Sequence, residues 1–283
     1  SNLKSLLEAG TSCVVIFGKS SSSQVKQIIG TSLKENLSMI KETVAYMKSN
    51  GRKVIYDAEH FFTAFAEDKD YALATLTAAL EGGAEYLTLC ETKGGFMMDE
   101  FRNAVKTVYE AFGDKVAIGV HTHNDCGLAV ANSILGVMEG ATMVQGVLLG
   151  FGERTGNANL STIIPDLQLK MGYSCIPQEN MKKLTSICKR VSELTNLSVD
   201  SQLPYVGASA FAHKAGMHID AVLKNPTAYE HIEPETVGNS RVFLMSEVAG
   251  KSTIVEKIQK IVPGIKKDDE AVEKIVACMK EKE

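Results

Sequence analysis

Short apolar runs alternate with longer amphipathic segments along the first two-thirds of the chain, and this alternation limits the fold more than any other feature. The apolar runs lie at residues 13–17, 54–57, 86–90, 116–123 and 143–148. The amphipathic segments lie at about residues 31–50, 69–82, 97–112 and 127–139. Continuous apolar strands that alternate with helices are typical of a parallel sheet covered by helices. The sequence therefore predicts an α/β protein with five βα units.

The number of units leaves two architectures open. A complete (β/α)8 barrel needs eight units within about 250 residues, whereas the pattern supplies five. Either the strands form an open doubly wound sheet, or three further units of a barrel precede them. After residue 160 the alternation stops, and we expect a helix at about 178–196, a second one from about Ser252, a break at Pro263–Gly264 and a final charged helix. We therefore predict a helical subdomain over 175–283.

Two histidines stand at the end of the fourth apolar run. His121 and His123 follow Val116–Val120 directly and precede a helix-like segment that begins at Gly127. Residues i and i+2 of a strand point to the same face, so the two imidazoles would project side by side. Such a pair is half of a divalent-metal site. The pattern alone also fits surface or hydrogen-bonded core histidines, but its place at the end of a strand in an α/β chain favours the metal.

Polar residues gather after each of the other predicted strands as well. They lie at residues 18–20, 59–60, 91–93 and 152–154. In a (β/α) barrel the carboxyl ends of the strands form the catalytic face. The sequence therefore predicts that these residues meet the histidine pair at one face of the sheet.

Composition and charge argue against several classes of partner and location. A formal net charge of −4 gives no reason to expect nucleic acid or an anionic membrane. No apolar stretch reaches the length of a membrane span, and no signal peptide is visible, although a chain that begins with Ser leaves upstream targeting open. The six cysteines are scattered without a C-x-x-C pair, which argues against a zinc ribbon or a disulfide framework. We expect reduced thiols and a cytoplasmic location.

Two long motifs resemble the citramalate, isopropylmalate and homocitrate synthases. They are Gly119-Val-His-Thr-His-Asn-Asp-Cys-Gly127 and Gly150-Phe-Gly-Glu-Arg-Thr-Gly-Asn157. The resemblance continues at residues 56–61, 204–207, 209–214, 216–218 and 229–234. It implies a metal-dependent barrel enzyme, an acyltransferase that condenses acetyl-CoA with an α-keto acid in branched-chain amino-acid biosynthesis. The segments at 57–61 and 229–232 look most like the citramalate synthase type, which favours pyruvate as the keto acid.

The resemblance also implies a metal site. It assigns His121 and His123 as ligands of a divalent ion (Mn, Mg or Zn) and places Asn157 at or near that ion. In the family a further carboxylate and a catalytic arginine come from an Asp-Thr-Thr-Leu-Arg-Asp-Gly segment on the first strand, and this chain has no such segment. We therefore expect an amino-terminally truncated partial TIM barrel over 1–174, made of the last five of eight βα units.

The carboxy-terminal subdomain has a functional match in the family. There it reaches over the barrel of a partner subunit and supplies a histidine and a tyrosine, which correspond to His218 and Tyr229. The resemblance therefore implies a homodimer in which His218 is the base that removes a proton from the acetyl group, assisted by Tyr229. A histidine with a pKa near neutrality suits this step.

Four further residues receive roles from the same comparison. Thr92 matches a threonine that contacts the carboxylate of the keto acid. Glu59 and Glu153 are expected to orient ligands or substrate, Glu59 as a member of the catalytic group and Glu153 on the substrate side. Asn124 is assigned to substrate binding as well.

Departures from the family pattern keep other functions open. Lys93 adds a cation where relatives have asparagine, and Leu148–Gly150 makes the end of the fifth strand more apolar. The absent first-strand segment would weaken metal binding and turnover. The alternatives are a carbon–carbon lyase of the same superfamily and an inactive fragment that binds metal or dimerises.

Overall fold

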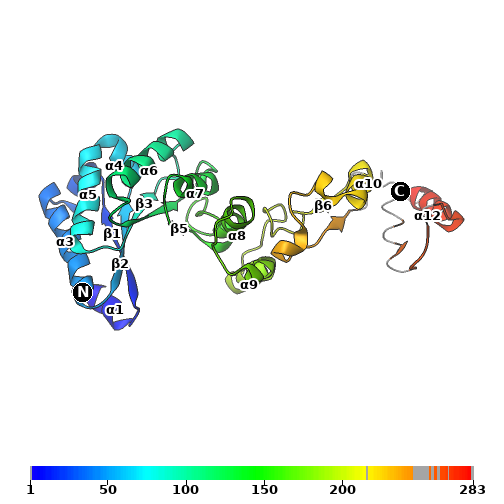
Figure 1. The fold of residues 1–283 in the computed structure, drawn as a ribbon, viewed down its shortest axis with the longest axis horizontal. Helices are drawn as coiled ribbons and strands as arrows, with labels where there is room; N and C mark the ends of the chain where they lie inside the picture. The colour runs from blue at the N-terminus through cyan, green and yellow to red at the C-terminus, as the bar shows by residue number, and fades with distance from the viewer. Residues whose placement is uncertain are drawn as a thin grey trace. The chain divides into compact units, whose positions relative to one another are not determined.

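The structure is a computed structural model that describes residues 2–214, 216–244, 255, 258–259, 262–266 and 268–281. The chain divides into two compact units, Ser1–Ile163 and Ile164–Glu283, and each unit is described by itself (Figure 1). The catalytic role predicted for residues 1–174 and the role in a partner subunit's active site predicted for residues 175–283 stay predictions. Within the described residues, no helix is both long and apolar enough to cross a membrane.

The first unit contains a five-stranded sheet in which every pairing is parallel. Its strands are β1 (Cys13–Lys19), β2 (Lys53–Glu59), β3 (Tyr86–Glu91), β4 (Ala117–Thr122) and β5 (Met143–Gln145). They confirm the five predicted strands. The order in the sheet is β1-β2-β3-β4-β5, whereas a doubly wound sheet reverses its order at a switch point. The sheet is therefore part of a (β/α) barrel, as predicted.

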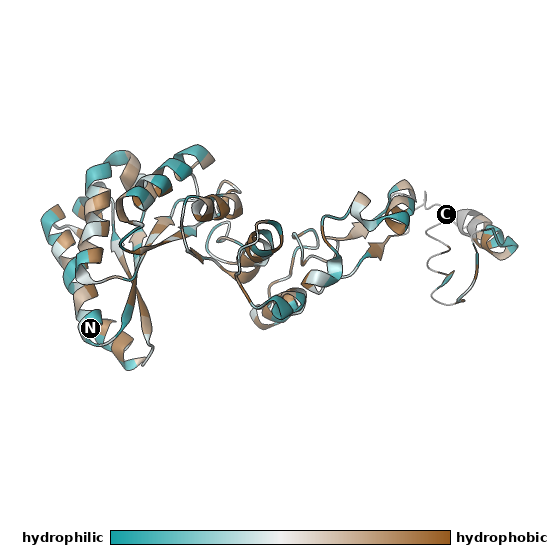
Figure 2. Ribbon diagram, in the orientation of Figure 1, coloured by the Kyte–Doolittle hydropathy of each residue, from teal (hydrophilic) through white to brown (hydrophobic). Residues whose placement is uncertain are grey.

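Helices follow the strands at the predicted places. They are α3 (Leu33–Ser49), α5 (Lys69–Gly82), α6 (Met98–Phe112) and α7 (Ala129–Met138). The helix α8 (Leu160–Pro165), at the end of the unit, was not predicted. Figure 2 shows both polar and apolar residues around these helices, as expected for helices that cover a sheet. The sequence did not predict α1 (Asn2–Glu8), α2 (Ser22–Gln24) with the π-helical turn Val25–Ile29, or α4 (Phe61–Glu67).

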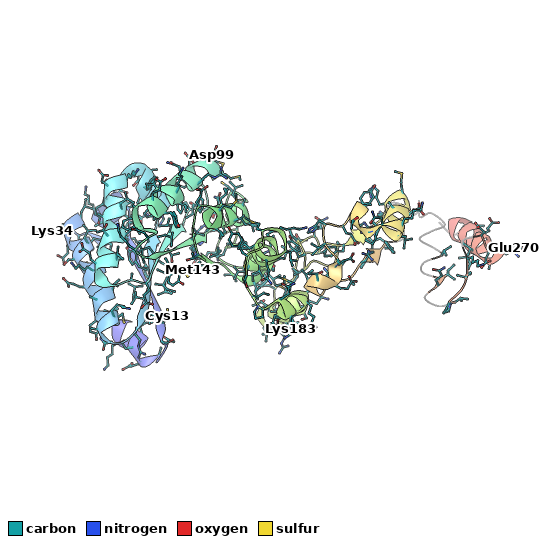
Figure 3. The ribbon with its side chains drawn as sticks, viewed as in Figure 1. Cys13, Lys34, Asp99, Met143, Lys183 and Glu270 are labelled. Carbon is teal, nitrogen blue, oxygen red and sulfur yellow. The ribbon has the colours of Figure 1, made fainter. Side chains whose placement is uncertain are left out.

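The two faces of the sheet differ in chemistry. The face packed against the helices is apolar, and its residues that are at most 1% exposed include Val54, Tyr56, Leu87, Leu89, Ile118 and Val120. Side chains alternate along a strand, so Asp57, Thr88, His121 and Gln145 share the other face. On β1 this second face is apolar and open, with Val15 48% and Phe17 71% exposed. Figure 3 labels Cys13 and Met143, the first residues of the two outer strands.

The second unit is built from short helices and turns. The predicted helix at 178–196 is a 3-10 segment (Gln178–Lys183) that runs into α9 (Leu184–Thr195). Further helical elements among the described residues of this unit are the π-helical turn Asp166–Lys170, α10 (Gly216–Lys224), the turns Pro226–Ala228 and Pro234–Val237, and α12 (Glu270–Glu281).

A small strand pair is an addition to the predicted helical subdomain. β6 (Ala212–His213) and β7 (Val242–Phe243) pair in parallel, and two residues per strand are too few to produce a periodic pattern. The final charged helix is confirmed by α12. The helix predicted from Ser252 begins outside the described residues.

Candidate active site

Strand register brings side chains from all five strands to one end of the sheet. Lys19 pairs with Glu59, Cys90 with His121, and His121 with Gln145. Two residues earlier along the strands, on the same face of the sheet, Asp57 pairs with Thr88. These positions are at the carboxyl ends of the strands, which is where barrel enzymes place their catalytic residues.

The His121 ring is held by a chain of side chains. Its Nδ1 lies 2.9 Å from Gln145 Oε1, and Gln145 Nε2 donates to Asp57 Oδ1 at 2.8 Å. Because Nδ1 is occupied, Nε2 is the ring nitrogen left for a ligand. Burial raises the pKa of Asp57, and hydrogen bonds from Gln145 and Thr88 oppose that rise.

The His123 ring lies beside it, with the two ring centroids 5.0 Å apart. His123 Nδ1 lies 3.2 Å from the backbone carbonyl oxygen of Glu91. A carbonyl can only accept, so Nδ1 carries the proton and Nε2 keeps its lone pair. Burial lowers the pKa of His123, and this favours the neutral imidazole that a metal ligand requires.

Asn157 lies opposite His123 through an isolated antiparallel bridge between the two backbones. Its Nδ2 donates to the Phe151 carbonyl oxygen at 3.0 Å, so Oδ1 is the atom available to a cation. The neighbouring Gly152 makes this placement possible, because a Cβ there would lie 1.9 Å from Asn157 Nδ2. The structure therefore brings together the three residues that the sequence assigned to the metal.

These three residues fit a divalent ion but do not complete its coordination. They offer two imidazole nitrogens and one amide oxygen, a donor set that zinc and other first-row divalent ions accept. Among the described residues there is no group of three or more His, Cys, Asp or Glu side chains that could hold a metal. The carboxylate ligand expected from the family pattern is thus not supplied by the described residues.

An arginine ties together the loops that follow β3, β4 and β5. Arg154 donates to both carboxylate oxygens of Asp125, at 2.8 and 2.9 Å, and to the carbonyl oxygen of Thr92 at 2.8 Å. The hydrogen bonds from Arg154 lower the pKa of Asp125. Gly94 leaves space for this pair, since a Cβ there would lie 2.2 Å from Asp125 Oδ2. Sequence reasoning gave Arg154 and Asp125 no role of their own, although both lie within the two long motifs.

The other predicted site residues of the first unit differ in their contacts and exposure. Thr92 Oγ1 accepts a hydrogen bond from the His60 backbone N–H at 2.9 Å. Glu59 forms an ion pair with Lys19, and both side chains are about one-quarter exposed or less. Asn124 Oδ1 accepts from the Ala129 N–H at 3.2 Å at the start of α7. Glu153 is exposed.

His218 and Tyr229 meet within the second unit. Their ring centroids are 4.4 Å apart with an angle of 32° between the planes, and Tyr229 is 50% exposed. The next residue, Glu230, is buried and receives hydrogen bonds from Arg241 Nε at 2.7 Å and His213 Nε2 at 3.0 Å. The predicted base and its assistant are therefore adjacent and are followed by a firmly anchored residue.

Two family models and several curated relatives match the chain over most of its length. Residues 1–191 match the HMGL-like family, and residues 205–283 match a domain described as homocitrate synthase post-HMGL domain-like. The (R)-citramalate synthase of Synechocystis sp. is 47% identical over 99% of this chain and 52% of its own length. The (R)-citramalate synthase of Aquifex aeolicus is 49% identical over 99% of this chain and 53% of its own length.

A solved structure supports the fold. The hydroxymethylglutaryl-CoA lyase of Pseudomonas aeruginosa superposes with a TM-score of 0.60 and 18% identity, over 69% of this chain and 67% of that one. At this identity the likeness concerns the fold alone. The chain spans about half the length of the curated relatives that it matches.

Proposed function

The chain belongs to the HMGL-like family, and we propose that it works as an acyltransferase that condenses acetyl-CoA with an α-keto acid. Pyruvate is the favoured keto acid, with citramalate as the product, because relatives named (R)-citramalate synthase match the chain over 99% of its length. The observation that carries the chemistry is the pair of imidazoles at the end of β4, with Nδ1 of each already engaged. We place the reaction in branched-chain amino-acid biosynthesis in the cytoplasm.

The proposed cofactor is a divalent ion (Mn, Mg or Zn) held by His121, His123 and Asn157. Such an ion supplies Lewis acidity that polarises the carbonyl of the keto acid. The Arg154–Asp125 pair keeps the surrounding loops in place. The Thr92 hydroxyl already accepts the His60 N–H, so its own proton is the part that can be donated to a substrate carboxylate.

The carbon–carbon bond requires a base for the acetyl methyl group. We assign His218 to take this proton and Tyr229, which lies against it, to assist. The resulting carbanion adds to the keto carbon, and water then hydrolyses the thioester and releases CoA. Glu59, Glu153 and Asn124 are proposed to orient the substrates, and the working form is proposed to be a homodimer.

A condensation assay tests this function. The purified chain is mixed with pyruvate, acetyl-CoA and Mn²⁺, and the free CoA thiol is measured together with citramalate. We expect both products, and we expect His123→Ala to abolish them because it removes one imidazole ligand. The same preparation is assayed for cleavage of hydroxymethylglutaryl-CoA, since cleavage without condensation would establish a lyase instead.

A second arm separates an inactive fragment from a wrong assignment. If the 283-residue chain releases no CoA but a version extended upstream does, the family activity stands and this chain is a metal-binding or dimerising part. If neither releases CoA with pyruvate or with longer α-keto acids, the proposed function is wrong.

A further inference from the structure

The His121 imidazole contacts the Gln145 side chain, and the Gln145 side chain in turn contacts Asp57. We propose that Gln145 is a positioning residue that fixes the tautomer and direction of His121, and that Asp57 in turn fixes Gln145. The inference rests on the proposed function, because it concerns a histidine that we assign to the metal. It adds two residues, on β2 and β5, to a site that the sequence motifs placed on β4 and the loop after β5.

The first step is the orientation of the Gln145 amide. Asp57 Oδ1 accepts a hydrogen bond from Gln145 Nε2 at 2.8 Å, and Thr88 Oγ1 lies 3.4 Å from the same nitrogen. An ionised carboxylate has only acceptor atoms, so it can face only the NH₂ end of an amide. The carbonyl end of Gln145 must then face the opposite way, toward His121.

The second step is the position of the His121 proton. Gln145 Oε1 lies 2.9 Å from His121 Nδ1, and an amide oxygen can only accept. Nδ1 must therefore be the protonated nitrogen, and Nε2 carries the lone pair. A metal-binding imidazole needs this arrangement, in which the second ring nitrogen donates to a fixed acceptor.

Strand register makes the three-residue chain possible. Gln145 lies beside His121 on the neighbouring strand, and Asp57 lies beside Thr88 in the row before. Gly119 occupies the next position in that row, between Thr88 and Met143. A Cβ at Gly119 would lie 3.1 Å from Thr88 Oγ1 and 2.6 Å from Met143 Cε, so a side chain there would crowd the space that Gln145 crosses.

His123 provides a contrast within the same molecule. Its Nδ1 lies against the backbone carbonyl oxygen of Glu91, an acceptor that no side-chain substitution removes. Only His121 therefore depends on the identity of a neighbouring side chain. A change at Gln145 should alter the His121 tautomer and leave that of His123 unchanged.

The test measures tautomers and metal affinity separately. Long-range ¹H–¹⁵N spectra of the metal-free 283-residue chain report which nitrogen of each of the six histidines is protonated, and His121→Gln identifies the His121 signals. Gln145→Met removes the acceptor at similar length, and Asp57→Asn removes the charge that orients the amide. Met143→Leu, two residues away on the same strand and face, is the control. Co²⁺ alone is then titrated into each protein by calorimetry.

We expect His121 in the unsubstituted chain to carry its proton on Nδ1. In Gln145→Met we expect a mixture of tautomers and Co²⁺ binding about 10- to 100-fold weaker, with a smaller change in Asp57→Asn and none in Met143→Leu. Unchanged His121 signals and Co²⁺ affinity in both variants would overturn the inference. If even the unsubstituted chain binds no Co²⁺, the metal part of the proposed function fails, and the His121 tautomer alone decides this inference.

Discussion

Glu230 is a charged residue with almost no access to solvent, and its surroundings explain how it stays charged. Its side chain is 2% exposed, forms an ion pair with Arg241 and lies within hydrogen-bond distance of His213 Nε2, while Arg241 also lies 3.5 Å from Glu233. Burial alone would raise the pKa of Glu230, but hydrogen bonds from Arg241 and His213 outweigh burial and lower it. This network fixes the residue that follows Tyr229.

The sign of the resulting pH dependence follows from the lowered pKa. The contribution of Glu230 to stability is fully present above the ordinary glutamate value of about 4.3. It is lost as the pH falls from there through the lower pKa of the folded state. We expect Glu230→Gln to reduce the free energy of unfolding at pH 7 by about 3 kcal/mol, since it leaves Arg241 without its buried partner.

Urea titrations followed by circular dichroism at pH 7 and in steps from pH 5 to pH 3 measure this effect. The difference between the original chain and the variant should shrink toward the acid end. A difference that stays constant, or grows, as the pH falls would show that the pairs with Arg241 and His213 do not stabilise the folded state.

Gly152 supports a second prediction at the scale of the residue. Its substitution by alanine would place a Cβ 1.9 Å from Asn157 Nδ2 and displace the proposed amide ligand. We expect Gly152→Ala to weaken Co²⁺ binding about tenfold, in line with the loss of a group that orients a ligand. Gly95→Ala is the matched control, because nothing lies within 4 Å of a Cβ at Gly95. Equal affinities in the two calorimetric titrations would contradict this role.

At the scale of the element, α5 shows how a polar side chain defines the start of a helix. Asp68 Oδ1 accepts the Tyr71 backbone N–H at 3.1 Å, which satisfies one of the free donors of the first turn. We expect Asp68→Ala to lower the free energy of unfolding by about 1 kcal/mol. Asp68→Asn keeps an acceptor at the same place and should cost less. If the urea midpoints of Asp68→Ala and Asp68→Asn coincide, Asp68 does not have this capping role.

The elements that could be predicted from sequence are those with enough residues to show a period. Helix α6, for example, buries Phe101, Val105 and Val108 on one face, and this helical spacing of apolar residues can be recognised in the sequence. Helix α4 could not be predicted because it begins at Phe61, only one residue after β2 ends. The residue between them, His60, has a φ of 59° and turns the chain sharply. Strand β5 ends at Gln145, earlier than predicted, because the Val147 N–H donates to the Ala158 carbonyl oxygen at 2.9 Å and Leu148–Gly150 form a 3-10 turn.

Some residues of the candidate site could likewise be predicted from the sequence, and others could not. His121, His123 and Asn157 lie in contiguous motifs, so the sequence could identify them. Asp57 and Gln145 are 88 residues apart and belong to no shared motif, so only the register of the folded sheet brings them together. Isolated residues of this kind carry no local signal from which their pairing could be predicted.

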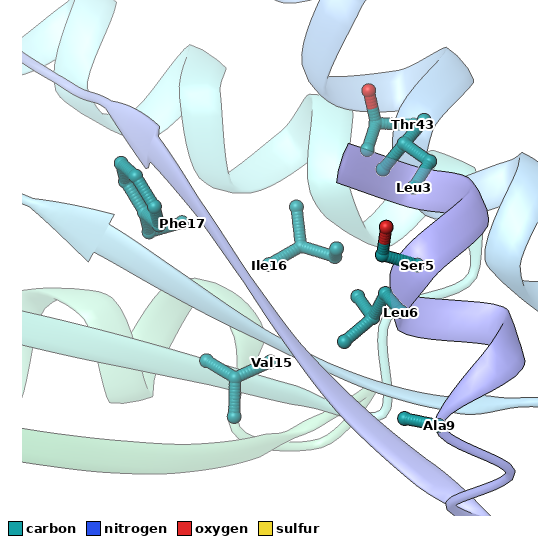
Figure 4. A pocket seen from close by; sticks show the side chains of 8 residues that line it. All are labelled: Leu3, Ser5, Leu6, Ala9, Val15, Ile16, Phe17 and Thr43. Carbon is teal, nitrogen blue, oxygen red and sulfur yellow. The ribbon is translucent and has the colours of Figure 1, made fainter. Parts of the chain in front are cut away.

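At the scale of the whole molecule, the outer strand β1 is the most exposed apolar region of the described sheet. It pairs with β2 on one side, and Phe17 on it is 71% exposed. Leu3 and Leu6 of α1, together with Val15, line a pocket beside this strand (Figure 4). Open strand edges and exposed apolar side chains promote association between chains.

We therefore predict that the chain self-associates through this region. Sedimentation velocity should show dimers or larger species for the original chain, and Phe17→Lys should shift the distribution toward the monomer by weakening association about tenfold or more. Met138→Lys, at a residue that is 54% exposed at the end of α7, is the control. A distribution that responds equally to both changes would place the interface elsewhere.

The sequential strand order has a consequence for how the chain acquires its structure. Each of the strands β2 to β5 pairs with the strand that precedes it along the chain, and one βα repeat spans only about 30 residues. Contacts between neighbours in sequence form faster than contacts between distant segments. During synthesis, each new strand can therefore join the sheet as soon as it emerges, before the remainder of the chain has been made.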